Sequence, residues 1–207
     1  MELQELYGVS RITVRQALLA LEQEDLIIRI RGKGTIVAQK KKIKETLSRI
    51  KSFTNEMLDH GMTPGSCGVK VEQVAAGKEL AEIFSCPETE KMIHLTRIRT
   101  GNDKPIVLFE TWLHVAVDLP LSADAYRNSL YDLLKEKGAD APWAVEDQFE
   151  AVLADRTICE ALGIPGGTPV MKRTRTGFDR KMNVQEYTVG YYDSRNYNYV
   201  IYLENNG

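Results

Sequence analysis

Arg97 and Arg99 are the two residues whose type and spacing best suit the binding of a small anion. They lie two positions apart in a run of extended character, so both guanidinium groups are expected on one face of a strand. Two adjacent cations repel each other unless an anion lies between them. Glu110 follows on the next expected strand. A cross-strand ion pair with Glu110 on a solvated face is the simpler interpretation, and the residues alone favour it.

Two further groups of polar side chains are candidates for ligand binding. Ser129 and Tyr131 lie in the segment SLYDLL, and Glu186 and Tyr192 lie in QEYTVGYY. The second pair is separated by about 20 Å along a straight strand, which is too far for one small ligand. Either the strand bends or bulges, for example at Gly190, or one of the two residues does not contact the ligand. Tyrosines are in any case more often core or interface residues than ligand contacts.

No residue pattern predicts a metal site, a disulfide framework or a catalytic centre. The three cysteines are Cys67, Cys86 and Cys159. They are far apart and match no zinc spacing. The three histidines form no metal-ligand motif. We therefore expect no metal, no cofactor and no catalytic residue.

The segment from Gly8 to Val37 indicates a different chemistry, the recognition of duplex DNA. Ser10 is a good N-cap, and an apolar stripe at helical spacing follows it. This stripe consists of Val14, Ala17, Leu18 and Leu21. The remaining side chains face outward, near a helix N-terminus of the kind that enters the major groove. The side chains expected to contact bases and phosphates are Ser10, Arg11, Thr13, Arg15 and Gln16.

A β-hairpin with a cationic turn is expected directly after this helix. Residues 27–30 and 35–38 are short β-branched runs. The turn between them is formed by Arg31, Gly32, Lys33 and Gly34. Two glycines permit positive φ, and the two cations suit phosphates or a narrow minor groove. Each fragment alone is more often a solvated helix or an ordinary turn, whereas their order and spacing favour DNA binding.

Charge is distributed unevenly along the 207 residues. Residues 1–51 contain 11 Lys and Arg against 6 Asp and Glu, whereas residues 52–207 contain 16 against 23. The basic end therefore coincides with the expected DNA-binding segment. The lysine-rich run at 40–44 indicates a linker that acts as a hinge. Two interpretations of its lysines are equally favoured, a solvated charge run and direct contact with DNA. We expect a head at 1–39, a linker at 40–47 and a larger domain at 48–207.

No apolar run approaches the length of about 20 residues that spans a membrane, and no signal peptide is visible. A cytoplasmic protein without a membrane partner is expected.

The larger domain is expected to be α+β with a mostly antiparallel sheet, because several extended segments follow one another through tight turns. Helices are expected from Ser52 or Thr54 through Leu58 to Gly61, and at 78–84, 123–137 and 156–162. Extended segments are expected at 67–75, 91–101, 104–116, 143–153, 168–178 and 184–203.

The segments YGVSRITVRQAL and LIIRIRGKGTIV resemble the winged helix-turn-helix of GntR-type bacterial transcription regulators. Members of this family carry a further helix before the position of Met1. The resemblance therefore implies a partial winged helix-turn-helix, in which Leu3, Leu6 and Leu18 lack part of their cover. We expect residues to precede Met1 in the complete protein.

From about Ser48 to Leu203 the chain resembles the effector-binding domain of the HutC branch of that family, called UTRA, whose fold is similar to chorismate lyase. The matching segments are LTRIRTGNDKPIVLFETWL, NSLYDLL and NVQEYTVGYYDSRNYNY. The resemblance implies that the arginine pair binds the anionic group of an effector and that the other positions hold hydroxyl or acetamido groups. The implied effector residues are Arg97, Arg99, Glu110, Ser129, Tyr131, Glu186 and Tyr192. Ser52 and Thr54 are added as the start of a helix that suits a phosphate, although simple capping explains them equally well.

The resemblance implies a ligand-responsive regulator, repressor or activator, that binds double-stranded operator DNA as a homodimer. The implied effector is a small anionic metabolite, first of all an amino sugar phosphate; other sugar phosphates, amino acid derivatives and fatty acids are open. One alternative is an enzyme of chorismate-lyase-like fold, which the lack of a nucleophile, a metal set and a histidine acid-base pair disfavours. The other is a sensor or adaptor that does not bind DNA.

Overall fold

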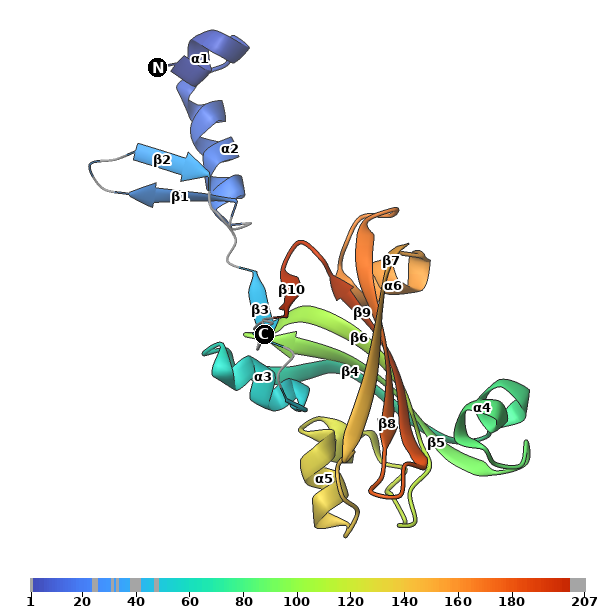
Figure 1. Cartoon of the computed structure of the whole chain (residues 1–207). Helices are drawn as coiled ribbons and strands as arrows, with labels where there is room; N and C mark the ends of the chain where they lie inside the picture. Colours follow the sequence, from blue (N-terminus) through green and yellow to red (C-terminus); the bar gives the residue numbers. More distant parts are fainter. Residues whose placement is uncertain are drawn as a thin grey trace, which may run out of the picture. The chain divides into compact units, whose positions relative to one another are not determined.

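The structure is a computed structural model that describes residues 2–23, 26–30, 32, 34–37, 42–46 and 49–201. The chain forms two compact units, Met1–Lys42 and Ile43–Gly207, so the boundary falls within the expected linker (Figure 1). Each unit is described by itself. Within the described residues, no helix is long and apolar enough to cross a membrane.

The N-terminal unit consists of two helices and a hairpin. Its elements are α1 (Glu2–Tyr7), α2 (Arg11–Gln23), β1 (Ile27–Ile30) and β2 (Gly34–Val37). Ser10 caps α2 as expected, because its Oγ accepts the backbone N–H of Thr13 at 3.2 Å. Strands β1 and β2 pair antiparallel. Both turn glycines have positive φ, +82° at Gly32 and +89° at Gly34. The other two turn residues, Arg31 and Lys33, lie outside the described residues.

The apolar face of this unit is only partly covered. Val14 and Leu18 are half-buried, whereas Ala17 is exposed. Leu3 and Leu6 are 41% and 72% exposed to solvent. The incomplete cover expected for the two leucines of α1 is therefore present in the described residues.

The larger unit is built on one six-stranded antiparallel sheet. In spatial order its strands are β4 (Pro64–Ala75), β5 (Lys91–Gly101), β6 (Lys104–Leu113), β9 (Val184–Asp193), β8 (Pro169–Phe178) and β7 (Ala144–Leu153). The α+β class and the antiparallel pairing are as expected. Outer strand β4 contains a register shift between Ser66 and Gly68. The opposite outer strand, β7, exposes Glu146, Gln148 and Glu150.

A short parallel pair lies apart from this sheet. Strand β3 (Ile43–Thr46) pairs with β10 (Tyr197–Val200). The sequence instead predicts a linker over residues 43–46 and one continuous strand at 184–203. That strand assignment is wrong because the chain turns after β9. The Asp193 carboxylate fixes the turn by accepting the backbone N–H of Arg195 at 3.1 Å and the side-chain amide of Asn196 at 2.7 Å.

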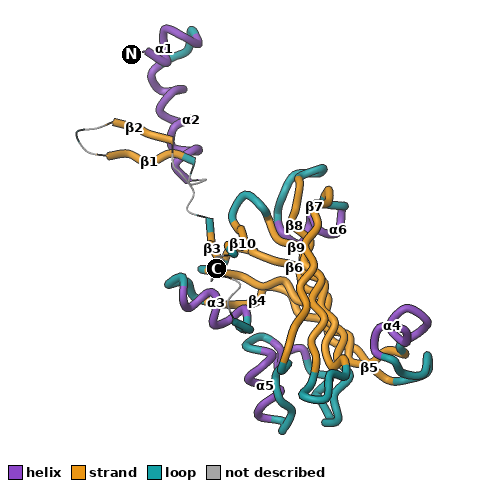
Figure 2. The backbone as a smooth tube through the Cα atoms, viewed as in Figure 1, coloured by secondary structure: helices purple, strands orange, loops and turns teal. Residues whose placement is uncertain are grey.

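Helices cover both faces of the sheet (Figures 1 and 2). They are α3 (Phe53–Asp59), α4 (Gly77–Phe84), the 3₁₀ helix η1 (Ala123–Tyr126), α5 (Leu130–Glu136) and α6 (Arg156–Leu162). The single helix expected at 123–137 is wrong, because Ser129 starts a new helix by accepting the backbone N–H of Asp132 at 3.3 Å. Side chains alternate along β6: Phe109 and Leu113 pack toward α3 and α5, whereas Leu108 packs toward α6.

Candidate functional site

A small cavity lies on the sheet face that α3 and α5 cover, and four arginines line it. Its free volume is about 50 Å³. It is lined by Lys51, Ser52, Phe53, Thr54, Arg97, Arg99, Phe109, Thr111, Leu130, Tyr131, Arg173, Arg175, Glu186 and Thr188. The sheet and both helices therefore contribute to one site.

Arg97 and Arg99 lie side by side on β5, and both are buried. Arg97 donates to the carbonyl oxygens of Tyr126 and Asn128 at 3.4 and 3.2 Å. Arg99 donates to the Asn128 carbonyl at 2.7 Å and to Thr54 Oγ1 at 3.1 Å. Within the described part of the chain, neither guanidinium forms an ion pair with a carboxylate. The expected common orientation of the two side chains is present.

The environment of this pair disfavours positive charge. Burial and the charge of Arg99 together lower the pKa of Arg97 to about 9, although the nearby Glu186 carboxylate opposes this effect. Burial also lowers the pKa of Arg99, to about 10. Both side chains are still protonated at neutral pH. Two buried cations without a neutralising carboxylate form an environment that a bound anion would stabilise.

Arg173 and Arg175 on β8 form a second pair, which the sequence analysis did not identify. Asp147 on β7 binds Arg175 in bidentate geometry, with Oδ1 and Oδ2 accepting from Nε and Nη2 at 2.8 and 2.6 Å. Burial alone would lower the pKa of Arg175, but the hydrogen bond to Asp147 together with the charges of Tyr131, Asp147 and Glu186 outweighs it and raises that pKa. Arg175 is thus neutralised within the protein, in contrast to Arg97.

A sequence signal for this second pair exists. Residues 97–101 read RIRTG and residues 173–177 read RTRTG, so the motif R-x-R-T-G occurs on both strands. Strands β5 and β8 place the two motifs in the walls of one cavity.

The remaining polar wall offers hydrogen-bond acceptors and hydroxyl groups. Thr188 Oγ1 lies 3.0 Å from Thr111 Oγ1 and donates to Glu186 Oε1 at 2.8 Å. Glu186 Oε2 is buried and forms no hydrogen bond with the described residues. Burial raises the pKa of Tyr131, and the Glu186 carboxylate raises it further, so the Tyr131 hydroxyl stays protonated. This wall suits a ligand that carries hydroxyl or N–H donors.

Glu110 lies on the opposite face of the sheet. It pairs with Thr96 on β5, whereas Arg97 pairs with Phe109. Since successive side chains alternate between faces, Glu110 points away from both arginines. The predicted ion pair between Glu110 and the arginines is therefore wrong, and Glu110 does not line the cavity.

Two other expected ligand residues have structural positions instead. Tyr192 is fully buried in the aromatic core, and its hydroxyl accepts from Tyr199 at 3.1 Å. The pairing of β9 runs through Gly190 without a register shift, so the bulge considered there is absent. Hence Glu186 lines the cavity and Tyr192 does not. Ser129 is the buried N-cap of α5 and also lies outside the lining.

Ser52 and Thr54 do line the cavity, at the start of α3. Ser52 Oγ accepts the backbone N–H of Asn55 at 3.2 Å, which is the capping role considered for it. Thr54 is held by Arg99. The cavity thus unites Arg97, Arg99, Tyr131, Glu186, Ser52 and Thr54.

The N-terminal unit carries the other candidate site. The N-cap and the four α2 residues expected to contact DNA are all exposed, namely Ser10, Arg11, Thr13, Arg15 and Gln16. The hydroxyl groups of Ser10 and Thr13 lie 2.9 Å apart, so capping occupies part of their hydrogen-bonding capacity. Gly32 and Gly34 form the described part of the turn, to which Arg31 and Lys33 also belong. The structure thus leaves the helix surface accessible to a partner.

In the described residues, no group of three or more His, Cys, Asp or Glu side chains is placed to hold a metal ion. The three cysteines are free thiols.

Comparison with known families matches two segments of the chain. Residues 1–37 match the description "Bacterial regulatory proteins, gntR family", and residues 59–198 match the UTRA domain. The chain belongs to the GntR regulators that carry a UTRA domain. This confirms the HutC-type resemblance, including a head that matches over residues 1–37 only. Family membership makes the protein a DNA-binding transcription regulator, and the alternative of a lyase-like enzyme is wrong.

Relatives of this regulator include named repressors. It is 30% identical to the HTH-type transcriptional repressor NagR of Bacillus subtilis, over 98% of this chain and 83% of that protein. It is 25% identical to the mannosyl-D-glycerate transport/metabolism system repressor MngR of Escherichia coli, over 96% of this chain and 82% of that protein. The crystal structure of PhnF from Mycobacterium smegmatis has the same fold, with a TM-score of 0.68 and 23% identity over 98% of this chain and 89% of that chain.

Proposed function

We propose that the regulator binds operator DNA as a homodimer and responds to a small phosphorylated metabolite, an amino sugar phosphate in the first instance. The observation that carries the proposal is the pair of buried arginines, Arg97 and Arg99, which have no carboxylate partner among the described residues. The phosphate group is proposed to bind there, because guanidinium groups recognise phosphate through charge-assisted, often bidentate hydrogen bonds.

The opposite wall supports a sugar as the rest of the ligand. Glu186 Oε2 can accept from a hydroxyl or amide N–H, and the Tyr131 hydroxyl can donate to a hydroxyl or acetamido oxygen. The name of the relative MngR refers to a glycoside, which also favours a sugar derivative. A fatty acid fits less well, because it would leave Glu186 Oε2 without a hydrogen-bond donor.

The size of the cavity implies that its walls move on binding. A volume of about 50 Å³ holds roughly one or two water molecules, whereas sites for small molecules typically occupy about 300 to 1,000 Å³. Binding therefore requires displacement of side chains that now fill the site. A ligand that prefers the opened state shifts the protein toward it.

For DNA, we propose that the N-terminus of α2 enters the major groove and that the hairpin contacts the adjacent backbone. Arg11 and Arg15 are the described cations on the exposed part of α2. In a homodimer, two such heads would bind half-sites of an inverted repeat about 10 bp apart, or a multiple of that spacing. The proposed effector response has a coupling of about 1 to 3 kcal/mol, equivalent to a roughly 5- to 150-fold change in DNA affinity.

Calorimetric titration with N-acetylglucosamine 6-phosphate, glucosamine 6-phosphate and unphosphorylated N-acetylglucosamine tests the ligand. We expect a phosphorylated sugar to bind and the unphosphorylated sugar to have at least a 100-fold lower affinity, because two charge-assisted interactions are lost. Equal affinity for all three sugars, or no binding of either phosphate, would refute this ligand class.

Fluorescence anisotropy with an operator selected from a random duplex library tests the DNA-binding role. The same titration, repeated with the bound sugar phosphate, measures the response. An operator affinity that no member of a sugar phosphate panel changes by more than twofold would contradict the proposed regulation.

A further inference from the structure

The larger unit, Ile43–Gly207, is called the effector-binding unit from here on. Its first strand, β3, is held to the rest of the unit by a short pairing. β3 and β10 form a two-stranded parallel ladder of four residue pairs. Just before it, the Ile43 N–H donates to the Asn196 carbonyl at 2.9 Å. A pair of strands this short has marginal stability by itself. Side-chain packing must therefore supply most of its stability.

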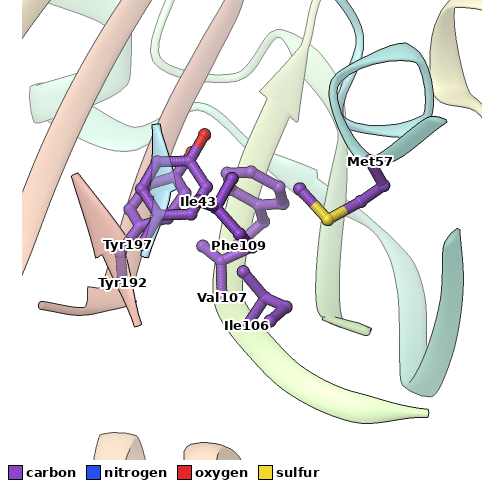
Figure 3. Close-up of a cluster of buried hydrophobic side chains, with 7 residues drawn as sticks. All are labelled: Ile43, Met57, Ile106, Val107, Phe109, Tyr192 and Tyr197. Carbon is purple, nitrogen blue, oxygen red and sulfur yellow. The ribbon is translucent and has the colours of Figure 1, made fainter. Parts of the chain in front are cut away.

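An aromatic cluster supplies that packing (Figure 3). Ile43 from β3 is buried against Tyr197 from β10, and Tyr192 and Phe109 from the main sheet belong to the same cluster. The rings of Tyr192 and Tyr197 lie 4.7 Å apart. Tyr199, two residues further along β10, also packs against this cluster. The position of β3 thus depends on how β10 packs against the sheet.

A direct hydrogen bond joins this cluster to the wall of the effector cavity. Arg173 lines the cavity, and its Nη1 donates to the hydroxyl oxygen of Tyr199. The Tyr199 hydroxyl in turn donates to Tyr192 at 3.1 Å. The guanidinium carbon of Arg173 lies 5.2 Å from the centres of both tyrosine rings. Its Nε is buried without a hydrogen bond to the described residues.

An anion in the cavity would compete with Tyr199 for Arg173. Hydrogen bonds between a guanidinium and a phosphate are roughly twice as strong as those with a neutral acceptor such as a phenol. The ion pair of Arg173 with Asp147 is long, at 4.0 Å, and so restrains Arg173 only weakly. Since the cavity must enlarge to admit a ligand, Arg173 is a side chain that can turn toward the anion.

We propose that Tyr199 couples occupation of the cavity to the pairing of β3 with β10. When an anion draws the guanidinium of Arg173 away, β10 loses the hydrogen bond that fixes Tyr199, and β3 loses its support. The inference rests on the proposed function, because it requires an anion in the cavity. Tyr199 does not line the cavity and acts as a positioning residue.

The release of β3 has a geometric consequence. The strand directly follows Lys42, the last residue of the N-terminal unit. Freeing its four residues adds up to about 13 Å of extended chain between the two units. A longer tether weakens the restraint on the spacing between the two DNA-binding heads of a dimer. Since two half-sites bind only heads at the matching spacing, a weaker restraint lowers operator affinity.

Hydrogen exchange of the full chain, with and without N-acetylglucosamine 6-phosphate, tests the coupling. We expect the ligand to raise the exchange rates of the amides at 43–46 and 197–200 by roughly tenfold, the equivalent of one hydrogen bond to a charged group. In Tyr199→Phe, these amides should exchange faster without ligand and show no further increase. Calorimetry should give a few-fold tighter binding to this variant, because the ligand no longer displaces the hydroxyl.

Tyr197→Phe is the matched control. It lies on the same strand, and its buried hydroxyl forms no hydrogen bond with the described residues. Its exchange pattern should therefore follow the wild type.

Two results would overturn the inference. One is calorimetric binding of the sugar phosphate without any change in exchange at 43–46. The other is an exchange rate at these amides in Tyr199→Phe without ligand that equals the wild-type rate. This comparison tests the role of the Tyr199 hydroxyl even if the sugar phosphate does not bind. If the sugar phosphate does not bind but the amides of Tyr199→Phe exchange faster than those of the wild type, only the proposed ligand is refuted. The role of the Tyr199 hydroxyl in holding β10 is then supported.

Discussion

Replacement of Arg97 by methionine is expected to stabilise the effector-binding unit while abolishing its affinity for anions. Burial and the neighbouring Arg99 lower the pKa of Arg97 from 12.5 to about 9. Since one pKa unit corresponds to about 1.36 kcal/mol, the buried cation costs the folded state on the order of 5 kcal/mol. Methionine occupies a similar volume without charge.

Lost hydrogen bonds offset part of this gain. The Asn128 carbonyl keeps its shorter bond from Arg99, at 2.7 Å, but the Tyr126 carbonyl loses the donor Arg97. An unsatisfied buried carbonyl costs about 1 to 3 kcal/mol. The expected net increase in the free energy of unfolding is therefore about 2 to 4 kcal/mol.

The sign of the pH dependence follows from the lowered pKa. Below pH 9, Arg97 is protonated in both the folded and the unfolded state, so the cost of its charge is complete. Above pH 9 the folded state releases the proton first, and the cost declines. The advantage of Arg97→Met over the wild type should thus be full at pH 7 and smaller at pH 10.

Urea unfolding followed by tryptophan fluorescence measures this effect. The protein has two tryptophans, Trp112 and Trp143, and both lie in the effector-binding unit. The buffer must be free of phosphate and sulfate, which would bind the arginines. Arg175→Met is the matched control, because Arg175 lines the same cavity but its removal leaves Asp147 with only the long, 4.0 Å ion pair to Arg173, and this variant should lose about 3 kcal/mol of unfolding free energy. A lower midpoint for Arg97→Met, or changes of the same sign in both variants, would refute the electrostatic reasoning.

Three further outcomes are expected. A sugar phosphate at 100 times its Kd should raise the free energy of unfolding by about 2.7 kcal/mol, and Arg97→Met should show no increase in the same urea titration. Arg15→Ala should weaken operator binding by roughly 1 to 3 kcal/mol if it contacts a base and lower the salt slope by about 1 if it contacts a phosphate, as anisotropy at several salt concentrations would reveal. Gly190→Ala should destabilise the unit by about 1 to 3 kcal/mol in thermal unfolding, because its Cβ would lie 2.8 Å from the Phe109 ring. Gly166→Ala, whose Cβ would meet no atom within 4 Å, should leave the melting temperature nearly unchanged.

The sequence predicted the regular elements of the sheet well, because alternating apolar residues and tight turns are local signals. The ends of the strands expected at 67–75, 91–101, 104–116, 143–153 and 168–178 differ from the observed ends by at most three residues. The errors arose where a single side chain redirects the chain. Ser129 starts a new helix within 123–137, and Asp193 ends a strand within 184–203.

The composition of the cavity was predicted only in part, because it depends on which strands lie side by side. The two-residue spacing of Arg97 and Arg99 fixed their common face, but the face of Glu110 depends on register, which an intervening turn sets. Arg173 and Arg175 reach the same cavity because β9 lies between β6 and β8. That order is a property of the whole sheet and has no local signal.

The two outer strands of the sheet have features that oppose uncontrolled self-association. A twelve-residue outer strand such as β4 exposes a row of unpaired backbone groups, which invites the addition of a further strand. The shift between Ser66 and Gly68 interrupts that row, so a flat strand cannot continue along its full length. On β7, the exposed Glu146 and Glu150 would repel another copy of the same edge. Removal of the extra residue Cys67 should therefore create a continuous edge and make the protein more prone to fibrous aggregation.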